Sequence, residues 1–150
     1  MDIQEQVYYP NYESARALPY DIINKLMTDN EEMWKLLRYE NVIGKDDLSM
    51  AEKRAMICTD SMNADKYNVV LQKFTEDAMT SDEGRVFAQI RLQVLSGYTM
   101  HPSSAKLSVV FQIVVNDKKM LCATDKTPYD NRAFAICQNI IECLNGKPLN

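Results

Sequence analysis

Apolar and polar positions alternate most regularly between residue 85 and residue 117. Every second residue from Val86 to Val94 is apolar, and the same holds from Leu107 to Val115. A period of two is typical of β-strands. The two runs flank the polar segment SGYTMHPSSA, so the pattern predicts one long β-hairpin whose tip runs from Tyr98 to Ala105.

The residues before this hairpin predict short helices. Residues 1–19 hold three tyrosines and two prolines without a regular period, which indicates an extended arm. Asp21 is a suitable N-cap for a first helix, and Asn30, followed by two glutamates, starts a second one that carries Trp34 toward the core. Ser49 with Glu52 forms the capping box of a third helix, expected from Met50 to Ile57.

The C-terminal segment predicts a further helix with one apolar face. Asp130 is the expected N-cap, and Gly146 followed by Pro148 ends the helix in the usual order. Apolar residues recur at the spacing of a helix between these limits. They are Ala133, Ile136, Cys137, Ile140, Ile141 and Leu144.

Two shorter runs of β-forming residues complete the predicted strands. One covers residues 67–75, and the other is KMLCA, which follows a tight turn at NDKK. Helices, then strands, then a helix indicate an α+β fold, with helices packed on one face of an antiparallel sheet of about four strands that includes the long hairpin. We expect residues 20–150 to form a single domain after an N-terminal extended arm of residues 1–19.

The charge of the chain and the lack of sorting signals narrow the class of protein. There are 17 Lys and Arg residues against 21 Asp and Glu residues, and the formal net charge is −4. Proteins that grip nucleic acid by its phosphates usually have a basic excess or a basic stripe, so we expect neither DNA nor RNA binding. No apolar run reaches the ~18 residues needed to span a bilayer, and MDIQEQVYYPNYE does not resemble a signal peptide. We therefore expect folding in a cytoplasm.

Residue patterns that carry chemistry are missing from the chain. The four cysteines show no C-x-x-C spacing, and His101 is the only histidine, so we expect no zinc site. With 4 glycines the chain has no glycine-rich phosphate loop, and no nucleophile motif accompanies His101. The acidic residues that are adjacent in the sequence occur where helix starts and loops are expected, which explains them without an acid–base pair or a metal site. We predict no catalytic residue, no metal and no cofactor.

The second face of the predicted hairpin is too apolar to lie fully in water, and open strand edges pair readily. Its apolar residues are Phe87, Leu95, Val110 and Val114. Either the chain's own helices cover this face or another subunit does. The tyrosines of the arm, likewise, either pack on their own domain or contact a partner. The candidate partner contacts are Tyr8, Tyr9, Tyr12, Gln89, Arg91, Gln93, Tyr98, Met100, His101 and Gln112.

Four stretches of the chain resemble small neck proteins of tailed bacteriophages. They are the helix NEEMWKLLRYENV, the short helix LSMAEKRAMI, the hairpin strand KLSVVFQIVVND and the last helix FAICQNIIECLNGKPL. These elements follow one another as they do in that family. The resemblance covers about residues 30 to 146 and consists of the order of helices and strands together with a few shared residues.

This resemblance implies a head-completion or tail-terminator protein. Such proteins form a homo-oligomeric ring, a head–tail connector at the phage neck that joins the portal side of the head to the tail, and their sheet and hairpin pack against neighbouring subunits. The implied partners are copies of the chain itself and other neck and tail proteins, with DNA as passing cargo, no membrane and no enzymatic activity. The implied location is the virion, assembled in the host cytoplasm. The alternative is a cytoplasmic, non-enzymatic binding or regulatory α+β module.

Overall fold

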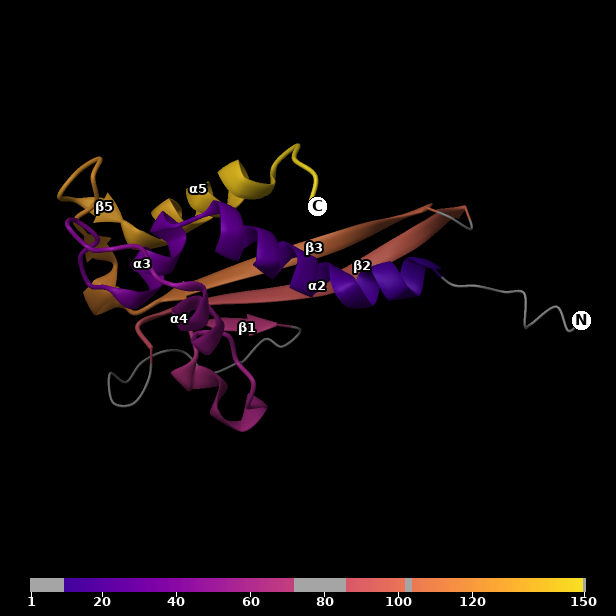
Figure 1. Cartoon of the computed structure of the whole chain (residues 1–150), viewed down its shortest axis with the longest axis horizontal. Coiled ribbons are helices and arrows are strands. Elements are labelled where there is room, and N and C mark those ends of the chain that lie inside the picture. The colour runs from indigo at the N-terminus through magenta and orange to yellow at the C-terminus, as the bar shows by residue number, and fades with distance from the viewer. Residues whose placement is uncertain (1–9, 72–85, 102–103, 150) are drawn as a thin grey trace, which may run out of the picture.

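The computed structural model describes residues 10–71, 86–101 and 104–149, and for residues 10–15, 61, 95–101, 104 and 105 it describes the backbone alone. The molecule is elongated, with most helices at one end and two long strands reaching toward the other (Figure 1). The elements in chain order are α2 (Pro10–Asp29), α3 (Glu32–Arg38), α4 (Met50–Ala55), the 3-10 helix η1 (Ser61–Lys66), β1 (Val69–Leu71), β2 (Ala88–His101), β3 (Ser104–Val115), the 3-10 turn η2 (Asp117–Lys119), β4 (Leu121–Cys122), β5 (Asp130–Asn131) and α5 (Arg132–Leu144).

The main sheet is mixed and has three described strands in the order β1–β2–β3. β1 is parallel to β2 and pairs with residues 90–92. β2 and β3 are antiparallel, with register shifts between Val94 and Ser96 and between Thr99 and His101. The fold is α+β as predicted, but the sheet is not purely antiparallel. The alternation in residues 67–75 predicted a strand and carried no information on its direction, and residues 72–75 of that prediction lie outside the described residues.

The expected fourth strand does not join this sheet. β4 pairs with β5 in a separate two-stranded sheet, with Leu121 opposite Asn131 and Cys122 opposite Asp130. The turn before β4 is η2, where the Asn116 side chain accepts a hydrogen bond from the Lys118 N–H at 2.9 Å. The count of about four strands is therefore not confirmed, because the pattern of a short strand does not say which partner it pairs with.

Helix α2 begins at Pro10 and runs through Pro19 to Asp29. Residues 10–19 are thus helical, and the extended arm predicted for them is wrong, while residues 1–9 lie outside the described residues. Asp21 lies inside the helix and is not its N-cap. Buried side chains in the second half of α2 hold it on the sheet, and such packing outweighs the weak local preference of a proline-containing segment. The buried side chains of this half of α2 are Ile22, Ile23, Leu26 and Met27.

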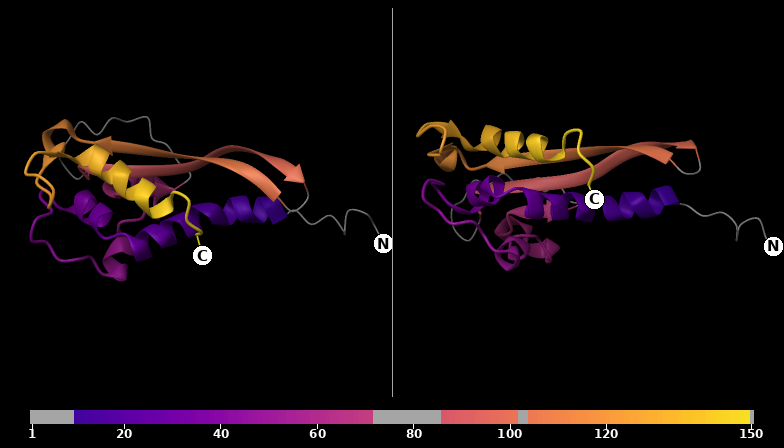
Figure 2. Two further views of the ribbon diagram at one scale, coloured as in Figure 1. Left: turned by 90° about the horizontal axis from the view of Figure 1, so that it is seen from above. Right: turned by 45° about the horizontal axis from the view of Figure 1, so that its top comes forward.

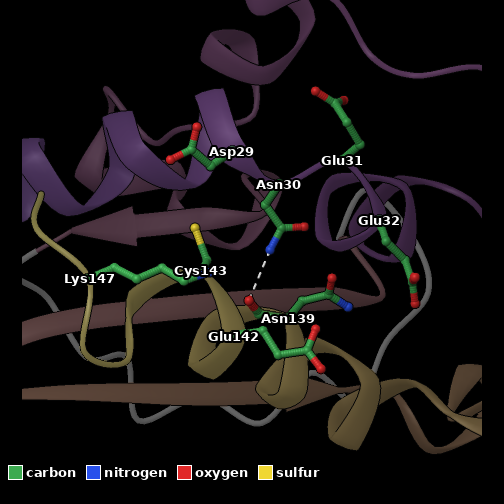
Figure 3. A pocket seen from close by; sticks show the side chains of 8 residues that line it. All are labelled: Asp29, Asn30, Glu31, Glu32, Asn139, Glu142, Cys143 and Lys147. Atoms are coloured by element: carbon green, nitrogen blue, oxygen red, sulfur yellow. Dashed lines mark hydrogen bonds between the residues drawn. The ribbon is translucent and has the colours of Figure 1, made fainter. Parts of the chain in front are cut away.

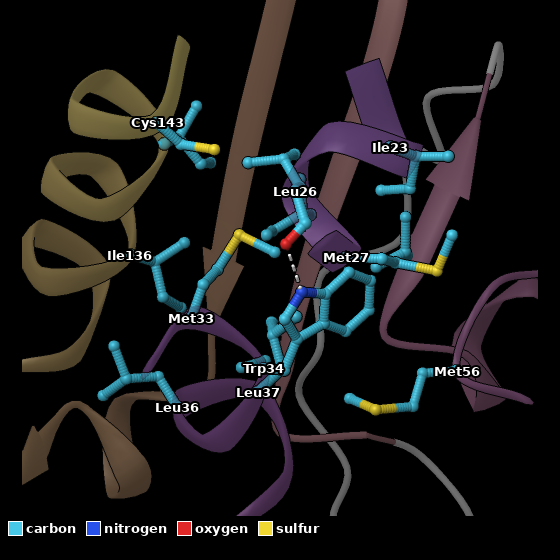
Figure 4. Packing of buried hydrophobic residues seen from close by; sticks show 14 of the residues in the cluster. Ile23, Leu26, Met27, Met33, Trp34, Leu36, Leu37, Met56, Ile136 and Cys143 are labelled. Atoms are coloured by element: carbon cyan, nitrogen blue, oxygen red, sulfur yellow. Dashed lines mark hydrogen bonds between the residues drawn. The ribbon is translucent and has the colours of Figure 1, made fainter. Parts of the chain in front are cut away.

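The core lies where α2, α3 and α5 meet one face of β2 and β3 (Figure 4). Ala88, Ile90 and Leu92 of β2 are buried there, and alternate residues of β3 pack against the same cluster. Trp34 is fully buried, as predicted, and its Nε1–H donates to the Leu26 carbonyl oxygen at 2.9 Å. These contacts join the end of α2 to α3 and fix both helices on the sheet.

Two of the predicted helix starts carry the expected side-chain caps. Ser49 Oγ accepts a hydrogen bond from the Glu52 N–H at 3.2 Å, which confirms the capping box of α4. Asn30 Oδ1 accepts from the Met33 N–H at 3.1 Å in the first turn of α3. The amide of Asn30 also donates to the Asn139 carbonyl oxygen at 3.0 Å, so this cap ties the α2–α3 junction to α5.

Helix α5 is rotated relative to its predicted apolar face. Its N-cap is Asn131, whose side chain accepts from the Phe134 N–H, and not Asp130. Its buried residues are Arg132, Ala135, Ile136, Ile140 and Cys143. Ile141, expected inside, is 59% exposed. A helix with apolar residues on two sides leaves the choice of buried side to its neighbours in the fold, which the sequence pattern does not contain.

The buried thiols predict a loss of stability at alkaline pH. Burial raises the pKa of Cys122 and of Cys143. A raised folded-state pKa gives a stabilisation that is complete below the unfolded thiol pKa of about 8.5 and is lost as pH rises through the higher folded pKa. In urea titrations under reducing conditions, stability should fall between about pH 7.5 and about pH 10. The double variant C122V/C143V should lose less over this range, and an equal loss would contradict the assignment.

Candidate functional site

Three of the predicted contact residues form a hydrogen-bonded row on the second face of β2 and β3. Gln89 Nε2 donates to the carbonyl oxygens of Ala64 and Tyr67 at 2.8 and 2.9 Å. Arg91 Nε donates to Gln89 Oε1 at 2.6 Å, and Arg91 Nη1 donates to Gln112 Oε1 at 3.3 Å. Gln89 is 1% and Arg91 3% exposed. These two side chains therefore stabilise the chain's own fold, and Gln112 is the exposed member of the row.

The other predicted contact residues are spread along the molecule. Gln93 is half-buried on β2. The backbone of Tyr12 belongs to the first turn of α2, and those of Tyr98, Met100 and His101 belong to the last residues of β2. His101 pairs with Ser104, so most of the segment predicted as the hairpin tip is strand. Tyr8 and Tyr9, together with residues 102 and 103, lie outside the described part of the chain.

The outer part of β2 and β3 extends beyond the rest of the sheet. Among the described residues β1 accompanies β2 along residues 90–92, whereas the pairing of β2 with β3 continues from Gln93–Val110 to His101–Ser104. We call residues 93–101 of β2 and residues 104–110 of β3 the β2–β3 extension. In Figures 1 and 2, α2 runs along this extension, while α3, α4 and α5 lie at the other end. Within the described residues, the extension has no third strand.

An exposed apolar surface lies at the opposite end of the molecule. Phe134 is 74% and Ile141 59% exposed on α5, and Leu121 of β4 and Tyr129 before β5 are 65% and 76% exposed. We call these four residues the α5 surface. The apolar spacing of the sequence predicted Ile141 on the buried face of this helix, and Phe134 was not part of that prediction. The spacing of Phe134, Cys137 and Ile141 at i, i+3 and i+7 is the signal that identifies a second apolar stripe on this helix.

A polar pocket of about 460 Å³ lies between the α2–α3 junction and α5 (Figure 3). It is lined by Asp29, Asn30, Glu31, Glu32, Asn139, Glu142, Cys143 and Lys147. Its carboxylates lie on different sides of the opening in Figure 3. No group of three or more His, Cys, Asp or Glu residues in the described ranges is arranged to hold a metal ion. Burial raises the pKa of Cys143, which disfavours the thiolate that a nucleophile requires.

Arg132 is fully buried, and the sequence analysis did not identify it. Its guanidinium donates to four backbone carbonyl oxygens, those of Leu36, Tyr39, Glu40 and Lys119. Three of these lie in the last turn of α3 or just after it, near the negative end of the helix dipole. Burial lowers the pKa of Arg132, yet arginine keeps its charge in proteins. A guanidinium with its donors directed at the chain's own backbone holds α5 to α3 and is not placed to act on a substrate.

Lys53 of α4 is a further buried charge with a role in the fold, besides Arg91 and Arg132. It is 1% exposed, and its Nζ donates to the Met27 carbonyl oxygen and to Glu31 Oε1, both at 2.7 Å. This ammonium ties α4 to the end of α2 and the start of α3. Like Arg91 and Arg132, Lys53 makes its hydrogen bonds within the chain, so these buried cations are not placed to bind a ligand.

The helices of the described part are too short or too polar to cross a membrane. The comparison with known proteins gave no relative. The chain matches no protein family, no curated protein and no solved structure. The resemblance to phage neck proteins therefore stays a prediction from the sequence, and a proposal of function must rest on the exposed surfaces described above.

Proposed function

We propose that this protein is a structural component of a tailed-phage virion that forms a ring at the neck and joins the portal side of the head to the tail. The observation that carries the proposal is the β2–β3 extension, which runs past β1 and α5 with α2 alongside it. The proposal assigns the chain no catalytic activity. Its partners are further copies of itself and other neck and tail proteins, and it involves no membrane.

The β2–β3 extension consists of two strands and has no third strand within the described residues. A two-stranded pair in water is marginal unless further strands or helices cover it, and open strand edges tend to pair with other chains. Val110 and Val114 on the second face are only half-buried, and Gln112 between them is exposed. We propose that β2 and β3 form one long hairpin, and that a neighbouring subunit covers its extension.

The charge of the chain is compatible with DNA as passing cargo. The formal net charge is −4, and four carboxylates line the pocket at the α2–α3 junction, of which Asp29 pairs with Lys25 and Glu31 with Lys53. A negative surface repels the phosphate backbone instead of holding it. A channel built from such subunits would let DNA slide through without specific binding.

The test is the assembly state of the purified chain. Mass photometry should show one discrete oligomer at a multiple of the 17.3 kDa monomer mass, and negative-stain electron microscopy should show rings. Antibody labelling of phage particles should place the protein between head and tail. A protein that stays monomeric at every concentration and is absent from particles would overturn the proposal.

The pocket at the α2–α3 junction supports the second candidate, a cytoplasmic binding or regulatory module. Its volume of about 460 Å³ lies in the range of small-molecule sites. Such sites are mostly lined by apolar and aromatic side chains, whereas this one has a polar, acidic lining. Binding of a cationic small molecule, detected by calorimetry and abolished by E142Q, would favour this candidate over the ring.

A further inference from the structure

The α5 surface is larger than the scattered apolar side chains of an ordinary protein surface. Its two aromatic rings, each about three-quarters exposed, alone present on the order of 300 Å² to solvent. Contiguous exposed apolar patches of a few hundred Å² mark interaction sites. The other large exposed apolar residues in the described ranges lie on four different segments, α2, α4, η1 and a loop; they are Tyr20, Met50, Met62 and Ile43.

The geometry of α5 and β4 brings three residues of the α5 surface together, Leu121, Phe134 and Ile141. Phe134 and Ile141 are seven residues apart, so they share one side of the helix about 10 Å apart along its axis. Leu121 pairs with Asn131, the N-cap of α5, and therefore lies beside the start of the helix. Cys122, the next residue, is buried, so Leu121 points away from the core, as the alternation of a strand requires.

We propose that the α5 surface receives the β2–β3 extension of a second copy of this chain. This inference rests on the proposed function and specifies which two surfaces meet in the ring. The two surfaces lie at opposite ends of one elongated molecule (Figures 1 and 2). Contact between two different surfaces, head to tail, is the kind of interface that closes into rings of more than two subunits. The same contact covers the apolar α5 surface and the part of the strand pair that has no third strand within the described residues.

The charges of the two surfaces support this pairing. Between Gln93 and Gln112 the formally charged residue is Lys106. The segment that carries the α5 surface has three carboxylates, on Asp125, Asp130 and Glu142, against one exposed lysine, Lys126. A nearly neutral strand pair with one cation meets no net repulsion from a segment that has more carboxylates than exposed cations.

The first experiment compares two pairs of substitutions in the full chain. F134Q/I141Q removes the apolar part of the α5 surface, and Y20Q/M62Q is the matched control, since all four residues are exposed and glutamine is a good helix former. Circular dichroism should be unchanged in both variants. Mass photometry should show F134Q/I141Q shifted to monomers, with at least about tenfold weaker association, and Y20Q/M62Q assembled like the unchanged chain.

The outcomes separate this inference from the proposed function. If the unchanged chain forms rings and F134Q/I141Q forms them equally well, the α5 surface is not the interface, although the ring stands. If the unchanged chain forms no ring, the proposed function itself fails.

A second experiment tests the head-to-tail arrangement by disulfide trapping. In a background with C58S and C137S, one preparation carries Q138C on the α5 stripe and another carries S108C on the extension, both at exposed positions. A cross-linked dimer should form only when the two preparations are mixed. Cross-linking within the Q138C preparation alone would show a symmetric contact between two α5 helices and would overturn the proposal, as would the absence of a cross-link in the mixture.

Discussion

Replacing Arg132 with methionine should lower the free energy of unfolding by about 3–5 kcal/mol. The substitution keeps a long apolar stem and removes the donors that satisfy the carbonyl oxygens of Leu36, Tyr39, Glu40 and Lys119. Each buried carbonyl left without a donor costs free energy. The stacking of the guanidinium on the Phe87 ring, with its carbon 4.7 Å from the ring centre, is lost as well. Urea unfolding followed by circular dichroism measures the difference.

The matched control is R38M, which makes the same chemical change on the surface. Arg38 is 44% exposed and pairs with Glu52 at 3.3 Å, so its loss should cost less than about 1 kcal/mol. R132K should also be strongly destabilised, because one ammonium cannot replace a planar fork of five donors. If R132M is no less stable than R38M, the guanidinium does not hold α3 and α5 together.

The sequence predicted local features of the fold better than their partners. The capping box of Ser49 and Glu52, the burial of Trp34 and the glycine that ends α5 depend on neighbours within a few residues, and the structure has all three. The direction of β1 and the separate pairing of β4 depend on residues far away in the chain. The alternation of apolar and polar residues indicates that one face of a strand is buried, but it does not indicate which element covers that face.

The candidate contact residues show the same difference between what depends on nearby residues and what depends on distant ones. Gln89 and Arg91 looked like contact residues because polar side chains on a strand usually face water. The segment around η1 covers them, and their hydrogen bonds are internal. Arg132 was overlooked for the same reason, although a cation in the first turn of a helix opposes the dipole and signals a special role. Its place four residues before the buried Ile136 puts it on the inward face of α5.

Replacing Trp34 with alanine is the second change expected to have a large effect, lowering the free energy of unfolding by about 3–5 kcal/mol. Trp34 is fully buried where α2, α3 and the sheet meet (Figure 4). W34F keeps most of the ring and removes the Nε1–H donor to Leu26 O, so it should cost about 1–3 kcal/mol. The exposed aromatic Tyr20 provides the control, because Y20A should change stability by no more than about 0.5 kcal/mol.

The position of Trp34 also connects stability with assembly. The indole holds the end of α2 against α3, and the first half of α2 runs along the β2–β3 extension. W34F should therefore weaken assembly of the folded chain more than Y20A does, because loosening α2 removes a support of the extension. The measurement is mass photometry at a temperature where circular dichroism shows both variants folded. Equal assembly of W34F and Y20A, with W34F less stable, would show that the support of the extension does not depend on this contact.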